Sequence, residues 1–460
     1  MKVLLTACLL LPLACGTTPA AASSCAGRPL DFDGDGRADL AIAAPYDRSR
    51  AGSVTVLYGS GEKTVLAQEG GAEPGDSFGS ALAAGDFDGD RCADLAVGVS
   101  EEFTGERTPG ADGNGVVQIY DGSPDGLVAG RELRLPKPSS DRFGASLAAG
   151  DFDDDGRDEL AVGAPSRGAG GSVTVYGMKG RKPYEITQKT SWVRQAASVT
   201  DQWGATLATG DFDGDGRAEL AVGAPSDTVA KDGQGSVTVI DVRRKRARQF
   251  TQSSPGIAGA AEKWDGFGSA LATGDFNGDR RADLAVGVPG EGITANQRAM
   301  DYGDGMVHVL YGSRSGVGGG GAEAWSQNTL DGRPRYFDRL GASLAAGDLN
   351  GDGLDELAVG VPGENSVQVL TGRPSGGLTR QGNLLVKGRG RDFGASVAVV
   401  PDWGSRHRPL AKQRPLYGLV AASPEQGVVM YTPGRRKSAL TLGGFRPLTT
   451  GTGLFGYTIS

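Results

Sequence analysis

Four carboxylates crowd into the nine-residue stretch DFDGDGRAD, residues 31–39, at positions 1, 3, 5 and 9. Carboxylates this close together repel one another unless a cation lies among them. Four such oxygen ligands, with the backbone carbonyl at position 7, could surround a hard cation, and calcium accepts six to eight oxygens at flexible geometry. Magnesium requires a near-ideal octahedron and retains more water. The stretch therefore predicts a calcium site.

The same acidic pattern recurs five times, beginning at residues 86, 151, 211, 275 and 348. Turn chemistry alone needs one or two Asp residues, not a fixed set repeated six times. Position 7 in each loop offers only its backbone carbonyl. The predicted ligands are Asp31, Asp33, Asp35, Arg37 and Asp39; Asp86, Asp88, Asp90, Cys92 and Asp94; Asp151, Asp153, Asp155, Arg157 and Glu159; Asp211, Asp213, Asp215, Arg217 and Glu219; Asp275, Asn277, Asp279, Arg281 and Asp283; and Asp348, Asn350, Asp352, Leu354 and Glu356.

Not all six sites are predicted to bind equally well. Asn277 and Asn350 each replace one carboxylate, which lowers the ligand charge. Arg91 and Arg280 occupy position 6, where the other four loops have Gly, and we expect strain there. The six sets contain 22 carboxylates, so the remaining 33 Asp and Glu residues are outnumbered by 47 Lys and Arg. The acidity of the chain is thus concentrated in the predicted metal loops, and we expect the ions to be structural.

Short strands must position these loops. The loop resembles the start of an EF-hand loop, but position 12 is Ile42 instead of Glu, and a strand-like apolar run follows it. An aromatic-Gly or Leu-Gly marker lies eight residues before five of the six loops, as at Phe78-Gly79. A small-residue strand, such as Ala145–Ala149, follows the marker and leads into the loop. Alternating strands come next, such as the one containing Leu220 and Val222.

The two ends of the chain complete each other. The first loop has no marker before it, whereas Phe455-Gly456 is a marker with no loop after it. Aligning Phe455 on Phe78 places Ser460 at Ala83, so the C-terminus would supply the first strand of the unit that the N-terminus finishes. A further copy, with its marker at Phe393-Gly394, has lost the acidic loop. We therefore predict an all-β fold, a seven-bladed β-propeller with four-stranded blades whose first blade is closed by the C-terminal segment.

The repeat resembles the FG-GAP repeat of integrin α-subunit propellers. The resemblance lies in F-G, then D-x-D-x-D-G-x-x-D, then L-A-V-G-A-P, and it covers nearly the whole chain after the N-terminal segment. It implies that the variable loops Ser100–Gly115, Ser226–Gly235 and Gly290–Gly305 lie on the face opposite the calcium loops, where partners would dock. These loops contain the candidate anchors Phe103, Arg107, Arg298 and Tyr302.

The N-terminal segment predicts export. Lys2 precedes an apolar run too short to span a bilayer, and Ala20–Ala22 offers a cleavage site, so we assign residues 1–22 to a signal peptide and 23–460 to the propeller. The alternative is a lipid anchor on Cys15. We expect the protein to be extracellular, without a transmembrane segment. Cleavage would leave Cys25 and Cys92, either as a disulfide or as two free thiols.

The chain is poor in catalytic signals. Of its two His residues, His308 lies in a strand and is predicted to face outward. Ser77 lies in a G-x-S-x-G sequence typical of hydrolases, but this sequence coincides with the F-G marker and a strand follows it. The basic run Arg243–Arg248 is interpreted as a solvated hairpin turn that does not bind nucleic acid.

These observations favour a monomeric, calcium-binding adhesion module for an extracellular protein or glycan, with no enzymatic activity. The alternative is an extracellular hydrolase built on a propeller, and a third interpretation is an envelope protein without a discrete ligand.

Overall fold

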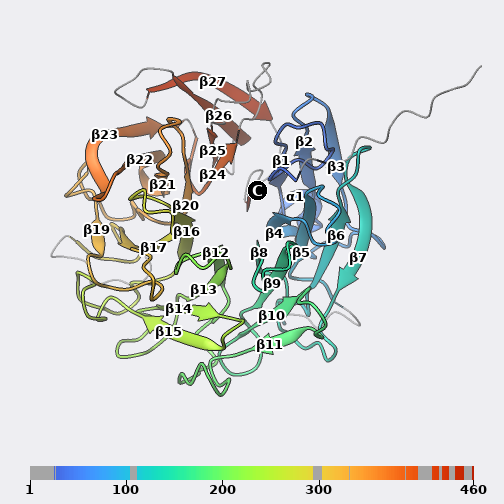
Figure 1. The fold of residues 1–460 in the computed structure, drawn as a ribbon, viewed down its shortest axis with the longest axis horizontal. Coiled ribbons are helices and arrows are strands. Elements are labelled where there is room, and N and C mark those ends of the chain that lie inside the picture. Colours follow the sequence, from blue (N-terminus) through green and yellow to red (C-terminus); the bar gives the residue numbers. More distant parts are fainter. Residues whose placement is uncertain are drawn as a thin grey trace, which may run out of the picture.

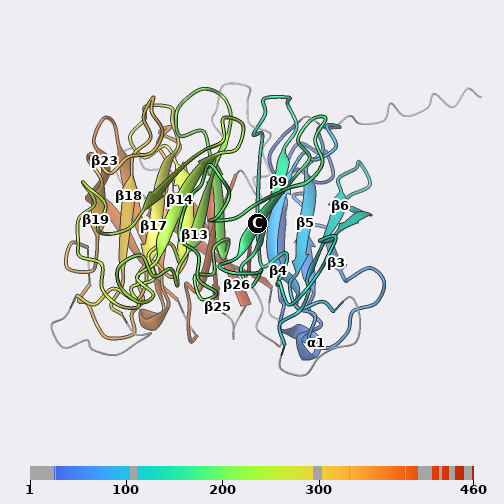
Figure 2. The ribbon, with the colours of Figure 1, turned by 90° about the horizontal axis from the view of Figure 1, so that it is seen from below.

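The computed structural model describes residues 25, 27–103, 111–293, 303–330, 332–388, 390–401, 417–423, 427–434, 441–449 and 458–459. Its strands form seven four-stranded antiparallel sheets. Figure 1 shows these sheets side by side in chain order around a common centre, and Figure 2 shows the loops gathered at the two ends of the strands. The architecture is all-β and consistent with a propeller.

Each sheet runs from an innermost to an outermost strand. The bounds are β28 Thr458–Ile459, β1 Leu40–Ala43, β2 Val54–Leu57 and β3 Lys63–Leu66; β4 Phe78–Gly85, β5 Asp94–Val99, β6 Val116–Asp121 and β7 Val128–Leu133; β8 Ser146–Gly150, β9 Glu159–Ala164, β10 Ser172–Tyr176 and β11 Tyr184–Ile186; β12 Thr206–Gly210, β13 Glu219–Ala224, β14 Ser236–Asp241 and β15 Arg246–Phe250; β16 Ala270–Gly274, β17 Asp283–Val288, β18 Met306–Leu310 and β19 Glu323–Trp325; β20 Leu344–Gly347, β21 Glu356–Val361, β22 Ser366–Arg373 and β23 Gly377–Lys387; and β24 Ser396–Pro401, β25 Tyr417–Ser423, β26 Gly427–Gly434 and β27 Thr441–Thr449. Two single turns, α1 Asp47–Arg50 and η1 Pro362–Glu364, complete the described elements.

The second strand of each sheet is buried on both faces, because a neighbouring sheet covers each side. Every residue of β5, β9 and β13 is buried, which is why the Leu-Ala-Val-Gly sequences read as continuous apolar runs. The hydrophobic core is divided into layers between sheets. One layer joins Val54 and Val56 to Phe78 and Leu95, and another joins Ile42 of β1 to residues of β24 and β25.

Two glycines of each repeat, one in the F-G marker and one in the L-A-V-G strand, allow neighbouring sheets to approach each other closely. Gly144, after the buried Phe143, has a φ of +86°, and its N–H donates to the carbonyl of Gly163 at 3.0 Å. A Cβ atom on Gly98 would lie 2.0 Å from the carbonyl oxygen of Gly144 in the next sheet. Both positions therefore require glycine, one for its backbone conformation and one for its lack of a side chain.

The C-terminal strand pairs with the first strand that follows an acidic loop. In β28, Ile459 lies opposite Ile42 of β1, and in the second sheet Leu82 lies opposite Val97. Aligning the repeats makes Ile459 equivalent to Leu82 and Ile42 equivalent to Val97. The register is therefore the one that the sequence alignment predicts, although the marker Phe455-Gly456 itself lies outside the described residues.

The prediction for His308 is wrong. This side chain is fully buried in β18 and packs against Phe267, with ring centroids 5.6 Å apart. Alternation along a strand leaves an outward face only where one side of a sheet meets water, and both faces of this sheet are covered. Burial lowers the pKa of His308 to about 4, so the imidazole is neutral at physiological pH.

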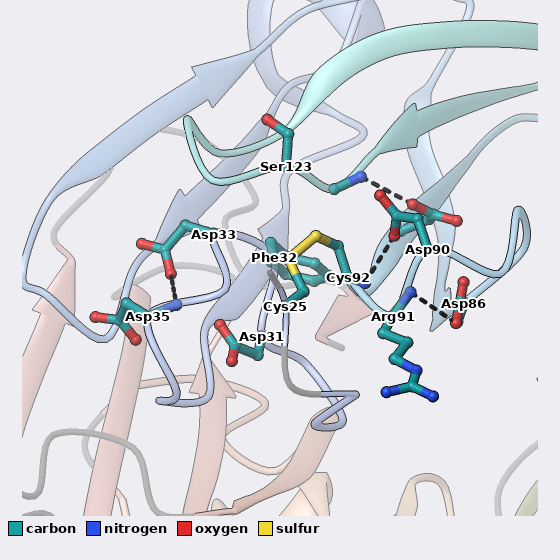
Figure 3. The surroundings of a disulfide bond; sticks show 12 residues. Cys25, Asp31, Phe32, Asp33, Asp35, Asp86, Asp90, Arg91, Cys92 and Ser123 are labelled. Carbon is teal, nitrogen blue, oxygen red and sulfur yellow. Dashed lines mark hydrogen bonds between the residues drawn. A yellow bond between two sulfur atoms is a disulfide. The ribbon is translucent and has the colours of Figure 1, made fainter. Parts of the chain in front are cut away.

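A disulfide joins Cys25 to Cys92. Figure 3 shows the bond between the first acidic loop, represented by Asp31 to Asp35, and the second, represented by Asp86 to Arg91. The cross-link encloses a sequence separation of 67 residues. It therefore ties the segment before the first loop to position 7 of the second.

We expect the double variant Cys25→Ser/Cys92→Ser to lose about 4 kcal/mol of stability, because a cross-link of this span restricts the unfolded chain. Denaturant unfolding of the variant and of the parent protein, with and without reductant, measures this loss. Reductant should lower the stability of the parent alone. Equal stability in all four samples would show that the disulfide contributes nothing.

Within the described residues, no helix is long and apolar enough to cross a membrane. The predicted signal peptide and Cys15 lie outside these residues.

Candidate metal centres

Each acidic loop immediately precedes the second strand of its sheet, and loops two to six join the first strand to the second, so all six lie at the same end of the strands. Residues 86–93, for example, connect β4 to β5 and place Asp94 as the first residue of β5. The variable loops connect second strands to third strands, as residues 226–235 connect β13 to β14. Because successive strands are antiparallel, the two kinds of loop lie at opposite ends of the second strand. Phe103 is within the described residues, whereas Arg107, Arg298 and Tyr302 are not.

The first loop brings its carboxylates together around one point. Oxygen atoms of Asp31, Asp33 and Asp39 all lie within 4.8 Å of one another. Backbone N–H groups of the loop hold the carboxylates in place: Gly36 donates to Asp31 at 3.0 Å, and Arg37 donates to Asp35 at 2.8 Å. The side chains are therefore positioned by the loop backbone.

The donor set fits a calcium ion. Oδ1 of Asp31 is buried and has no hydrogen-bond partner, so an electron-rich oxygen faces the cluster without a donor. Burial, and next the charges of Asp33 and Asp35, raise the pKa of Asp31 above its usual value, although the Gly36 N–H opposes this. All side-chain ligands are oxygens, as a hard cation prefers. Without a cation, the cluster destabilises the ionised loop.

Three further loops show the same convergence within 4.8 Å. The converging sets are Asp86, Asp88 and Asp90; Asp151, Asp153 and Glu159; and Asp211, Asp213 and Asp215. In loops one and three the third carboxylate of the cluster is the residue at position 9. In loops two and four it is the residue at position 5. Oδ1 of Asp153 is another buried oxygen without a hydrogen-bond partner. The carbonyl ligands at position 7 remain predictions.

The acidic residue at position 9 is buried in every loop. In loops one to five it accepts the backbone N–H of the Phe at position 2, for example from Phe32 to Asp39 at 2.7 Å. Asp39 also accepts the N–H of Gly59, after β2, at 2.7 Å. Burial is the largest cause of a raised pKa at all six positions. The pKa is about 7 for Asp94 and Asp283, and about 8 for Asp39, Glu159, Glu219 and Glu356.

Successive loops are joined to one another by backbone hydrogen bonds, which sequence reasoning did not predict. The carbonyl oxygen of Asp31 accepts the N–H of Ala93 at 3.2 Å, and that of Asp86 accepts the N–H of Asp158 at 2.9 Å. Three further bonds of this kind join Asp151 to Ala218, Asp211 to Ala282, and Asp275 to Asp355. Each bond runs from position 1 of one loop to position 8 of the next, so the six loops form one connected row.

An arginine side chain from outside the fourth loop contacts the carboxylates of that loop. Nη1 of Arg244, from the turn between β14 and β15, lies 2.7 Å from Oδ2 of Asp213 and 3.2 Å from Oδ2 of Asp241. The other nitrogen contacts Asp215. Residues 243–245 of the basic run form the predicted hairpin turn, whereas residues 246–248 lie in β15, and Arg244 pairs with carboxylates of an acidic loop instead of facing solvent alone.

The two loops with Arg at position 6 keep the left-handed backbone conformation of the loops with Gly there. Arg91 and Arg280 have φ values of +74° and +67°, in the region that favours glycine. In the sixth loop, the Asn350 amide donates to Oε1 of Glu356 at 2.7 Å. Whether these sites bind calcium more weakly stays a prediction.

The opposite ends of the strands carry a repeated carboxylate that the sequence analysis overlooked. Asp76, Asp141, Asp201, Asp265 and Asp338 each lie two residues before a marker residue and are buried. Each accepts a backbone N–H from the segment before it, as Ser198 donates to Asp201 at 2.8 Å. Its regular spacing from the marker was the available signal. These residues support the loop turns.

The G-x-S-x-G sequence does not form a strand-to-helix turn, because Ser77 is followed by strand β4, not by a helix.

The repeats, sheets and loops together define a class of all-β repeat proteins. Residues 78–120, 143–176, 203–240, 267–310 and 340–386 match the FG-GAP repeat, and residues 31–97 match the FG-GAP-like repeat. Together the matches cover more than half of the sequence. The chain belongs to the FG-GAP repeat family.

The relatives of this chain include an integrin alpha subunit and a phospholipase D. The chain is 30% identical over 240 residues to integrin alpha-PS2 of Drosophila melanogaster, which covers 50% of this chain and 16% of the relative. It is 27% identical over 369 residues to the phosphatidylinositol-glycan-specific phospholipase D of Mus musculus, covering 72% and 42%. The chain thus spans less than half the length of either relative. A streptogramin B lyase structure aligns over 86% of this chain and 93% of its own, with a TM-score of 0.47 and 9% identity.

Proposed function

We propose that the protein is an extracellular, calcium-stabilised, seven-bladed FG-GAP propeller that binds a protein or glycan through its variable loops. The observation that carries this proposal is the convergence of carboxylates, with buried oxygens lacking a donor, in loops of one repeated form. Calcium would neutralise these carboxylates and fix the segment that precedes the second strand in six of the seven sheets. Residues 1–22 would direct export, as the sequence analysis predicts.

Closure of the propeller by the C-terminal segment is part of this proposal. Its support is the pairing of β28 with β1 and the contacts of β28 with β24 and β4 on either side. Leu40 and Ile42 of β1 also pack against Val400 and Val420. A closed ring leaves no sheet face uncovered at the join and gives the variable loops a rigid support.

A binding module is favoured over a hydrolase because the described site residues offer oxygen ligands and structural hydrogen bonds. His308 is buried and neutral, and Ser77 has no hydrogen-bond partner on its hydroxyl. A nucleophile needs an adjacent base within hydrogen-bond reach.

The variable loop of residues 226–235 offers a candidate contact for a partner, because Val229 in this loop is 51% exposed.

The binding proposal is tested by screening labelled protein against panels of extracellular proteins and glycans. A matched pair of variants separates the two faces: one replaces residues 228–232 with a Gly-Ser segment, and the other replaces residues 179–182, at the calcium-loop end. We expect the first variant alone to lose binding. Loss in both variants, or hydrolysis that Ser77→Ala abolishes, would contradict the proposal.

The sixth loop offers a test of calcium at a single site. Asn350→Asp should bind calcium roughly threefold to tenfold more tightly there, because affinity increases with ligand charge. The same change should destabilise the metal-free protein, since it places a second carboxylate beside Glu356 in place of an amide donor. Calcium retained after gel filtration and melting in chelator measure the two effects.

Asn328→Asp, at an exposed position, is the matched control and should change neither quantity. An Asn350→Asp variant that behaves like this control would indicate that loop six does not hold a metal.

A further inference from the structure

A pocket of about 290 Å³ lies beside the fourth acidic loop, between the β14–β15 hairpin and the turn that follows β18. Its lining includes Arg246, Arg248, Arg314 and Ser315. Its lining also includes the half-buried Val239 and Ala247 and the buried Phe250 and Val317. The lining of the pocket therefore combines three arginines with apolar residues.

The strand register explains why the arginines converge. Arg246 and Arg248 are two residues apart in β15, so their side chains leave the same face of the strand. Nη1 of Arg248 donates to the carbonyl oxygen of Val317 at 3.3 Å, and its guanidinium lies 4.9 Å from the ring centre of Phe250. Arg314 lies in the turn that follows β18 of the neighbouring sheet, so residues of two sheets line the pocket.

The charges of these three arginines are not neutralised within the protein. Among the described residues, Arg246, Arg248 and Arg314 form no ion pair. The acidic residues of the pocket are already engaged: Asp213 and Asp241 pair with Arg244, and Glu219 accepts the N–H of Phe212 at 2.9 Å. The lining has four arginines against Asp213, Glu219 and Asp241, a formal excess of one positive charge on a chain whose formal net charge is −8.

We propose that this pocket binds a sulfate or phosphate monoester carried by a sugar. Guanidinium forks match the oxygens of a tetrahedral oxyanion, and Ser315 adds a neutral donor. The half-buried side chains of Val239 and Ala247 in the lining suit the ring face of a small sugar. A single concave pocket fits a compact ester better than an extended polyanion, which would need a basic stripe and would be repelled by the net negative chain.

The site lies at the calcium-loop end of the sheets, away from the variable loops, and it is distinct from the proposed partner face. None of the three arginines is a proposed metal ligand. Asp213 and Glu219, predicted ligands of loop four, also line the pocket, so the titrations are made both in calcium and in chelator to separate failure of the ester site from failure of the calcium site.

Isothermal titration of the full chain with glucose 6-sulfate, glucose 6-phosphate and unmodified glucose tests the proposal. We expect at least one ester to bind and glucose not to bind. Arg246→Gln and Arg314→Gln should each weaken ester binding roughly tenfold or more, since each removes a charged hydrogen-bond donor. Arg243→Gln is the matched control, because Arg243 is exposed in the same hairpin turn but does not line the pocket.

The pattern of results identifies the ester or refutes the site. Binding of one ester alone supports the proposal and names its source. Equal affinity of all three arginine variants, no preference for either ester over glucose, or binding of heparin without binding of the monoesters would overturn it. Melting temperatures equal to that of the parent protein verify that the variants are folded.

Discussion

In a chelator at pH 8, the protein should melt roughly 10–20 °C below its melting temperature in millimolar calcium. A site filled at a hundred times its dissociation constant contributes about 2.7 kcal/mol, and six sites in a chain of this size give a shift of this order. Scanning calorimetry of the two samples measures the shift. Magnesium at the same concentration is the control and should restore less of the stability.

The difference between the calcium and chelator samples should increase with pH. In the metal-free protein, burial raises the pKa of the six position 9 carboxyls to about 7 or 8, far above the values of an unfolded chain. The protonated forms therefore stabilise the fold fully below about pH 4, and this contribution is lost as the pH rises through 7 and 8. Calcium neutralises the ionised carboxylates, so the loaded protein should hold its stability over the same range.

Melting curves between pH 5 and 8 test this dependence. The chelator sample should melt at progressively lower temperature as the pH rises, while the calcium sample changes little. A gap that is constant or that closes with rising pH would show that these carboxyls do not meet a metal.

Breaking the pairing of β28 with β1 should have the second large effect. Ile459→Pro removes a backbone donor and restricts the strand beside Ile42, which should cost about 1–3 kcal/mol. Removing residues 450–460 should do the same and also expose the edge of β1, which favours aggregation. Ile459→Val keeps the backbone donor and is the matched control.

Denaturant unfolding and light scattering measure these two outcomes. If the truncated chain is as stable and as monodisperse as the parent protein, the C-terminal segment does not close a ring. If Ile459→Val is as damaging as Ile459→Pro, the side chain and not the strand pairing would be responsible.

The sequence was most informative where the repeat imposes a fixed backbone. The acidic spacing located the carboxylates that converge in loops one to four, and aligning Phe455 with Phe78 predicted the register of Ile459 against Ile42. Such features repeat because each copy needs the same turn and the same glycine contacts between sheets.

The sequence was least informative where two sheets meet. His308 was expected at the surface because alternation within one strand does not reveal that a second sheet covers its other face. Arg244 and Arg314 belong to different hairpins, so their places beside the fourth loop depend on the packing of two sheets. The bond from Ala93 to Asp31 likewise joins residues of different repeats.

The central claim is that calcium occupies the six acidic loops. The most direct measurement is anomalous diffraction from crystals grown in calcium, at a wavelength where calcium scatters anomalously and water does not. We expect an anomalous peak among positions 1, 3, 5, 7 and 9 of each loop, with the weaker peaks in the two loops that contain Asn277 and Asn350. Ordinary water density at those points, with no anomalous signal in any of the loops, would contradict it.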